Sequence, residues 1–178
     1  VTLTQGLEGY DGYGKPVYEG YARVDVTDVD EGSWDNCGME SMRVRRNVPA
    51  GCEDELIAKG YDRNGDGKLN SSDWIDVNGN GKKDYDESGF EEVTLNDGSK
   101  VKMSPYNTFV EFFCCDAGQA ATIELHGWDN GRKVDGNGRR DMMNPWRNHN
   151  YCWLNIVIED KSEPKVTAPP MAKVDCDD

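Results

Sequence analysis

The chain has 178 residues, and its 34 Asp and Glu against 20 Lys and Arg give a formal net charge of −14. This charge argues against nucleic acid and anionic membrane surfaces as partners. The length favours one domain with a large insertion or two small domains, and no apolar run reaches the roughly 18 residues of a membrane-spanning helix.

The first residues are expected to form a strand, followed by a stretch rich in tyrosine and glycine (YDGYGKPVYEGY, Tyr10 to Tyr21). Aromatic residues are favoured as interface anchors, so this stretch is a candidate contact between subunits. Apolar and charged residues then alternate over 22–26, which is typical of a half-buried strand.

An acidic loop follows this strand and contains Asp28, Asp30, Glu31 and Asp35. A sandwich would place such a loop at one end, where calcium can stiffen a junction between modules. The alternative is a plain solvated turn.

Further strand candidates cover 41–45, 93–95, 101–103 and 108–114, with longer ones near 122–126 and over 152–158. Glycine-rich and acidic turns separate them and long helices are absent, so we predict an all-β chain with an antiparallel sandwich. The segment 47–96 interrupts this pattern. We interpret it as a mostly irregular insertion with one short helix over 53–59.

Two acidic stretches in the insertion have the spacing of calcium loops, 62–73 (DRNGDGKLNSSD) and 76–87 (DVNGNGKKDYDE). A twelve-residue calcium loop supplies oxygens from positions 1, 3, 5, 7 (a carbonyl), 9 and 12, with glycine at position 6 for the sharp turn. The predicted ligands of the first loop are Asp62, Asn64, Asp66, the Lys68 carbonyl, Asn70 and Asp73. Those of the second loop are Asp76, Asn78, Asn80, the Lys82 carbonyl, Asp84 and Glu87. We therefore expect two Ca²⁺ ions, and the alternative is a pair of solvated acidic turns.

Three features distinguish these loops from a regulatory EF-hand. Asp73 is shorter than the usual bidentate Glu, and position 8 is apolar in one loop (Leu69) but charged in the other (Lys83). The loops also begin too close together for two full helix-loop-helix units. The first loop resembles a dockerin calcium loop, and the tight spacing resembles thrombospondin type 3 repeats. Both resemblances imply structural calcium rather than a sensor, with a segment that becomes disordered in chelator.

A further acidic stretch, 129–141 (DNGRKVDGNGRRD), offers oxygens from Asp129, Asp135, Asn137 and Asp141, with a carbonyl from Arg139. It is a candidate for a third calcium ion. Its four basic residues lower the local affinity for a cation.

The six cysteines are even in number and contain no CxxC motif: Cys37, Cys52, Cys114, Cys115, Cys152 and Cys176. This distribution favours disulfides in an oxidising compartment over zinc ligation. Adjacent Cys114 and Cys115 would face opposite sides of a strand, so each is expected to have a different partner.

Three segments, DVDEGSWDNCGMESMRV (28–44), FVEFFCCDAGQAATIEL (109–125) and NYCWLNIVIEDKSEPKVTAPP (150–170), occur in an order that is similar to hyalin-repeat-like modules. These are immunoglobulin-like modules of large secreted Bacteroidota surface proteins. The resemblance implies an immunoglobulin-like module over 1–164, interrupted by the insertion, with 165–178 as a linker and the opening strand of a following module. A cysteine that the family often has before the linker proline is replaced by Ala168, which leaves the partner of Cys176 open.

Together these features predict a secreted, calcium-stabilised structural or adhesive unit without catalytic activity, as part of a longer or processed chain. Its expected partners are neighbouring modules or identical subunits. Neither His126 nor His149 has a catalytic triad around it in sequence, and calcium accounts for the acidic residues better than glycoside hydrolysis does.

The alternative function is a calcium-dependent carbohydrate-binding module that could bind surface glycans. Its candidate sugar-stacking residues are the tyrosines of 10–21 and Trp34, Trp74, Trp128, Trp146 and Trp153. The competing expectation is that Trp128 and Trp153 pack over the sandwich while Trp74 caps the calcium segment.

Overall fold

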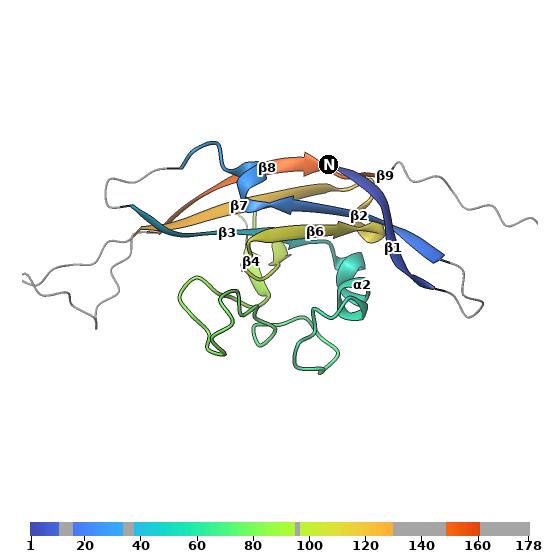
Figure 1. Ribbon diagram of the computed structural model, residues 1–178, viewed down its shortest axis with the longest axis horizontal. Helices are drawn as coiled ribbons and strands as arrows, with labels where there is room; N and C mark the ends of the chain where they lie inside the picture. The colour runs from blue at the N-terminus through green and yellow to red at the C-terminus, as the bar shows by residue number, and fades with distance from the viewer. Residues whose placement is uncertain (11–15, 34–37, 95–96, 130–148, 161–178) are drawn as a thin grey trace, which may run out of the picture.

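The computed structural model describes residues 1–10, 16–33, 38–94, 97–129 and 149–160, and its strands form two sheets (Figure 1). The first sheet, in the order β6-β2-β1-β9, consists of β6 (Phe109–Phe113), β2 (Pro16–Asp25), β1 (Thr2–Tyr10) and β9 (Glu159–Asp160). The second, in the order β4-β5-β3-β7-β8, consists of β4 (Glu91–Thr94), β5 (Lys100–Met103), β3 (Met39–Val48), β7 (Ala120–Asp129) and β8 (His149–Val157). All neighbours are antiparallel except β1 and β9, which are parallel. The all-β prediction is confirmed.

One hydrophobic core draws side chains from both sheets. Ala121, Ile123 and Leu125 alternate along β7 and are buried in it, as the alternation near 122–126 predicts, and Ile123 is completely inaccessible. The first sheet contributes Val24 from β2 and Phe112 from β6. Since successive side chains of a strand point to opposite faces, the other residues of β7 lie on the outer face of the five-stranded sheet.

The helices are short. They are α1 (Val26–Val29), α2 (Glu53–Ala58) and the 3₁₀ turns η1 (Ala50–Cys52) and η2 (Cys114–Asp116). The predicted helix over 53–59 is confirmed as α2, whose first turn carries three acidic residues that suit the helix dipole. The strand predicted over 22–26 ends one residue early, because Val26 begins α1. Among the described residues, none of these helices has the length and apolar character needed to cross a membrane.

A second, smaller core joins the segment after β3 to the sheets. Leu69 and Phe90 of that segment pack with Val48 of β3 and Phe113 of β6. A disulfide between Cys52 and Cys115 covalently links the same two regions. In Figure 1 the segment from α2 to β4, drawn in green, projects from one side of the strands.

The cysteine pairing differs from a simple strand pattern. Cys114 and Cys115 lie in η2, after β6 has ended at Phe113, so strand alternation does not separate them. Cys114 and Cys152 have no disulfide partner within the described part of the chain. Cys37 and Cys176 lie outside that part.

A buried ion pair lies between the two cores. The Arg46 guanidinium donates to both carboxylate oxygens of Asp116 at 2.7 and 3.0 Å, and the two side chains are 2% and 0% exposed. The Phe113 backbone N–H donates to the same carboxylate at 2.9 Å. The Arg46 guanidinium also lies over the Phe112 ring. This pair therefore fixes the start of η2 against β3.

Candidate functional site

The first candidate site is the pair of predicted calcium loops, which share one hydrogen-bonding scheme. At position 1, the carboxylate of Asp62 accepts the N–H of Gly67 at 2.7 Å, and Asp76 accepts the N–H of Gly81 at the same distance. Both glycines have positive φ, 79° and 75°, which side chains with a Cβ rarely adopt. The sharp turn predicted at position 6 is therefore present in both loops.

The acidic residue at position 12 closes each loop. Asp73 accepts backbone N–H groups from Arg63 at 2.9 Å and Asn70 at 2.8 Å, which are positions 2 and 9 of the first loop. Glu87 does the same at positions 2 and 9 of its own loop, at 2.8 and 3.0 Å. Both carboxylates are buried, at 0% and 4% exposure. The shorter Asp73 thus fills the same structural role as Glu87.

Side chains at the intermediate ligand positions converge within each loop. The amides of Asn64 and Asn70 both donate to one carboxylate oxygen of Asp66, at 3.2 and 2.9 Å. In the second loop the amides of Asn78 and Asn80 meet one oxygen of Asp84, at 2.6 and 2.7 Å. Rotation of such an amide by half a turn presents its oxygen instead of its nitrogen.

This donor set of carboxylate, amide and backbone oxygens fits Ca²⁺, a hard cation that prefers six to eight oxygens. Soft or imidazole-preferring metals are a poor match, because neither loop contains Cys or His. Within the described ranges, only Cys52, Cys115 and Asp116 bring three thiol, imidazole or carboxylate groups within 4.8 Å. Two of those groups are disulfide-bonded, so their sulfurs are not available as thiolate ligands.

The first loop is anchored to the sheets through apolar contacts. Leu69, at position 8, is 3% exposed and belongs to the smaller core. The Phe90 N–H donates to the Asn70 carbonyl at 3.0 Å, which ties the exit of the second loop to the first. Where the chain after the second loop passes the first loop, a Cβ on Gly89 would lie 2.4 Å from the Ser71 carbonyl oxygen. Only glycine fits there without moving the backbone.

We expect Gly89→Ala to destabilise the fold by about 1–3 kcal/mol, because the added methyl overlaps main-chain atoms that a rotamer change cannot move. Chemical denaturation measures the loss. Gly51→Ala is the matched control, because a Cβ at Gly51 has no atom within 4 Å. Equal stability of the two variants would contradict the close packing of the two loops.

The second loop is anchored through a salt bridge. Asp86 pairs with Arg43 of β3 at 2.5 Å, and the two side chains are 5% and 14% exposed. Tyr85 packs edge-on against Trp128 of β7, with ring centroids 6.1 Å apart. Lys83, at position 8, is exposed. The first loop therefore packs against the smaller core, whereas the second loop contacts β3 and β7. The different residues at position 8, buried Leu69 and exposed Lys83, agree with these separate contacts.

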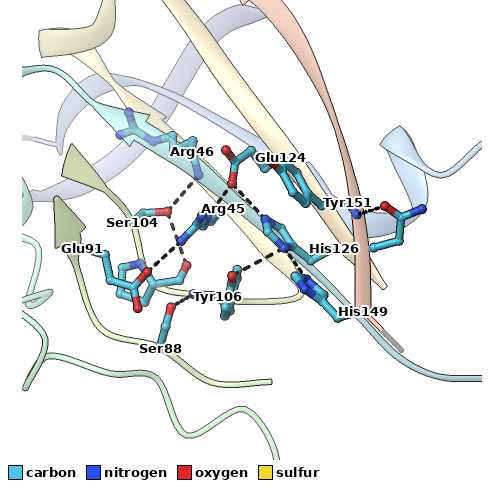
Figure 2. Close-up of polar contacts among 12 residues, drawn as sticks. Arg45, Arg46, Ser88, Glu91, Ser104, Tyr106, Glu124, His126, His149 and Tyr151 are labelled. Atoms are coloured by element: carbon cyan, nitrogen blue, oxygen red, sulfur yellow. Dashed lines mark hydrogen bonds and ion pairs between the residues drawn. The ribbon is translucent and has the colours of Figure 1, made fainter. Parts of the chain in front are cut away.

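A polar and aromatic cluster lies beside this contact on the outer face of the five-stranded sheet (Figure 2). Glu124 accepts from Arg45 at 2.6 Å and lies 2.9 Å from His126 Nε2. The other ring nitrogen of His126 lies 2.8 Å from His149 Nε2 and 3.4 Å from the Tyr106 hydroxyl. Burial opposes ionisation of Glu124, yet hydrogen bonds from His126 and Arg45 hold its pKa below its usual value.

His149 is exposed on one side, yet partial burial, followed by the nearby His126 and Arg45, lowers its pKa below the usual 6.5. The ring stacks on Trp128 at a centroid distance of 4.6 Å, which accounts for part of its desolvation. The unfolded chain therefore binds a proton at His149 that the folded chain resists. The stability that depends on neutral His149 is present above pH 6.5 and decreases as the pH falls below that value.

We accordingly expect the free energy of unfolding to fall between pH 6.5 and the lowered pKa, and His149→Phe to reduce that slope. Phenylalanine keeps the stacking on Trp128 but cannot titrate. Urea denaturation at several pH values measures the slope. An unchanged slope in the variant would show that other groups govern acid sensitivity in this range.

The remaining predicted ligands do not gather into a third site within the described residues. Asp28 accepts the N–H of Asp25 at the start of α1, and Asp30 accepts the N–H groups of Gly32 and Ser33. Hydrogen bonds from Ser33 lower the pKa of Asp30. Glu31 is exposed. These contacts cap local turns.

The other candidates lie at or beyond the end of β7. Asp129 is 4% exposed at the last position of that strand. Asp35, Asp135, Asn137, Arg139 and Asp141 lie outside the described residues, as do Trp34 and Trp146. Of the other tryptophans, Trp128 is buried and Trp74 half-buried, whereas Trp153 is 66% exposed rather than packed over the sheet.

Sequence reasoning missed the cluster around His126, and only part of it had a local signal. Glu124, His126 and Trp128 alternate along β7, which indicates a shared face. Their partners Arg45 and Tyr106 lie far away in the sequence, and nothing near them points to the contact. No protein-family model, curated protein or solved structure matches this chain.

Proposed function

We propose that this chain is a calcium-stabilised, disulfide-bonded structural or adhesive unit of an extracellular surface protein or filament, without catalytic activity. The observation that carries the proposal is the scheme repeated in the two loops, in which the carboxylate at position 1 accepts the N–H of position 6 and the carboxylate at position 12 accepts the N–H groups of positions 2 and 9. Two loops anchored separately to the sheets suit a brace better than a sensor. In sensor EF-hand proteins calcium opens a pair of helices around each loop, and the described structure has no helix between 59 and 90.

Further support comes from the disulfide, which is typical of oxidising compartments. The core shared by the two sheets supports an immunoglobulin-like sandwich over 1–164, with 47–96 as its insertion and 165–178 leading to a following module. Neighbouring modules or identical subunits are the proposed partners.

Isothermal titration calorimetry with Ca²⁺ tests the proposal. We expect two sites, one lost in Asp62→Asn and the other in Asp76→Asn. Lys68→Ala is the control, because Lys68 contributes only its backbone carbonyl. Absence of calcium binding at millimolar concentration would overturn the proposal.

A calcium-dependent carbohydrate-binding module is the second candidate. It is favoured by Tyr151 and Trp153, which are 51% and 66% exposed and neighbours on one face of β8. Their rings are tilted by 42°, so they do not form the flat platform that best fits a sugar chain. A glycan-array screen distinguishes this candidate, because binding that Trp153→Ala abolishes would favour it.

A further inference from the structure

The last strand of the five-stranded sheet, β8, has an open edge. It pairs with β7 over nine consecutive positions, from His149 opposite Trp128 to Val157 opposite Ala120. In the described part of the chain, no strand lies on its other side. An edge of this kind presents a row of backbone donors and acceptors that another strand can use.

The hydrogen bonds of its neighbour show which groups of β8 face outward. The Thr122 N–H donates to the Asn47 side chain at 2.7 Å, on the side of β3, so Thr122 directs its backbone groups away from β8. Asn155, directly opposite Thr122, then directs its own groups away from β7, toward the open edge. Because this direction alternates along a strand, the backbone groups of His149, Tyr151 and Trp153 also point toward the open edge.

Two contacts agree with this assignment. The Tyr151 N–H is bonded to the side chain of its neighbour Asn150 at 2.9 Å rather than to β7. The Val157 carbonyl accepts the ammonium group of Val1 at 3.0 Å. The end of the strand at Val157 is therefore covered, and the edge from His149 to Asn155 has no partner among the residues that the structure describes.

The composition of β8 lacks the usual protection of an edge. Its sequence, HNYCWLNIV, contains no Asp, Glu, Lys, Arg or Pro, although 30% of the whole chain is charged. The register with β7 has no bulge. Natural proteins block exposed edges with charges, proline or bulges, and β8 has none of these. A chain of net charge −14 repels its own copies, so self-association is best placed at a surface without charge.

We propose that β8 pairs with β8 of a second copy, antiparallel about a two-fold axis at Cys152. This register places Tyr151 of each copy opposite Trp153 of the other, and such cross-strand aromatic pairs stabilise sheets. The two Cys152 residues become a non-hydrogen-bonded pair, with Cα atoms about 4.5 Å apart. That separation lies within the range of about 4.4–6.8 Å that a disulfide spans. The two five-stranded sheets would join into one continuous sheet.

Sedimentation velocity over a concentration series tests the pairing. We expect a monomer–dimer equilibrium that Trp153→Lys weakens at least tenfold, because both Tyr151–Trp153 pairs are lost and two positive charges lie diagonally across the axis. Thr27→Lys, an exposed change of the same charge in α1, should leave it unchanged. Circular dichroism checks that both variants fold. A monomer at every concentration, or a dimer insensitive to Trp153→Lys, would overturn the pairing.

Cysteine cross-linking tests the register. With oxidised glutathione as the oxidant, two Cys152 thiols lose two protons and two electrons to form one disulfide, and glutathione leaves as two thiols. The covalent dimer should be absent in Cys152→Ser and retained in Cys114→Ser, which removes the other unpaired cysteine among the described residues. Retention in Cys152→Ser would overturn this register.

The pairing and the proposed function fail separately. A monomer that still binds two calcium ions overturns the pairing alone, whereas a dimer that binds no calcium overturns the proposed function alone. Glycan binding by a monomer through Trp153 would assign this face to a sugar and overturn the pairing.

Discussion

Excess EDTA is expected to lower the midpoint of thermal unfolding by roughly 10–20 °C. Each site contributes about 2.7 kcal/mol when free Ca²⁺ is about a hundred times its dissociation constant. For a chain of this size, 1 kcal/mol shifts the midpoint by about 2–4 °C. Without the ion, the carboxylates of each loop repel one another with no cation to neutralise them.

Limited proteolysis should show where this stability is lost. We expect chelator to expose cleavage sites in 62–87, after which calcium but not magnesium restores resistance, because Mg²⁺ does not readily give up its waters to a flexible loop. Asp66→Asn should mimic part of the chelator effect in the presence of calcium. Lys68→Ala is the control, and unchanged melting and proteolysis in chelator would contradict a structural role for calcium.

Asp116→Asn is expected to destabilise the fold by about 3–5 kcal/mol, since it leaves the charge of Arg46 buried without its counter-ion. Arg46 is 2% exposed, so bulk water does not replace the lost carboxylate. Guanidinium chloride denaturation measures the loss.

The exposed pair Arg23 and Asp25 provides the control for this experiment. Its side chains are 42% and 40% exposed, so solvent screens the pair and Asp25→Asn should destabilise the fold far less than Asp116→Asn. The double variant Arg46→Met/Asp116→Leu replaces both buried partners. It should recover part of the stability lost in Asp116→Asn, because no unpaired charge remains. Equal effects of Asp116→Asn and Asp25→Asn would contradict the role of the buried pair.

The sequence predicts the turns of the calcium loops well because the pattern is local. In each loop the donors and acceptors of the turn lie within twelve positions, as from Asp62 to Asp73 in the first. Glycine is found at position 6 because the sharp turn needs a positive φ. Calcium binding itself stays a prediction. Strand alternation likewise locates β7 and β8, since a period of two is set by neighbouring residues.

The remaining features depend on contacts between distant residues. Arg45 and Glu124 are 79 positions apart, and Arg46 and Asp116 are 70 apart, so no local pattern pairs them. The pairing of Cys52 with Cys115 also depends on a contact between distant residues. It follows from the packing of η1 against η2, which spacing alone does not reveal.

The Cys52–Cys115 disulfide also determines how the chain responds to tension. When the two ends are pulled apart, force passes through the bond and bypasses the segment between the two cysteines, which are 63 positions apart. At about 3.3–3.6 Å per residue, roughly 200 Å of chain stays unextended even after the sheets separate. Both predicted calcium loops lie within this segment, so a chain with an intact bond can be stretched without pulling these loops open.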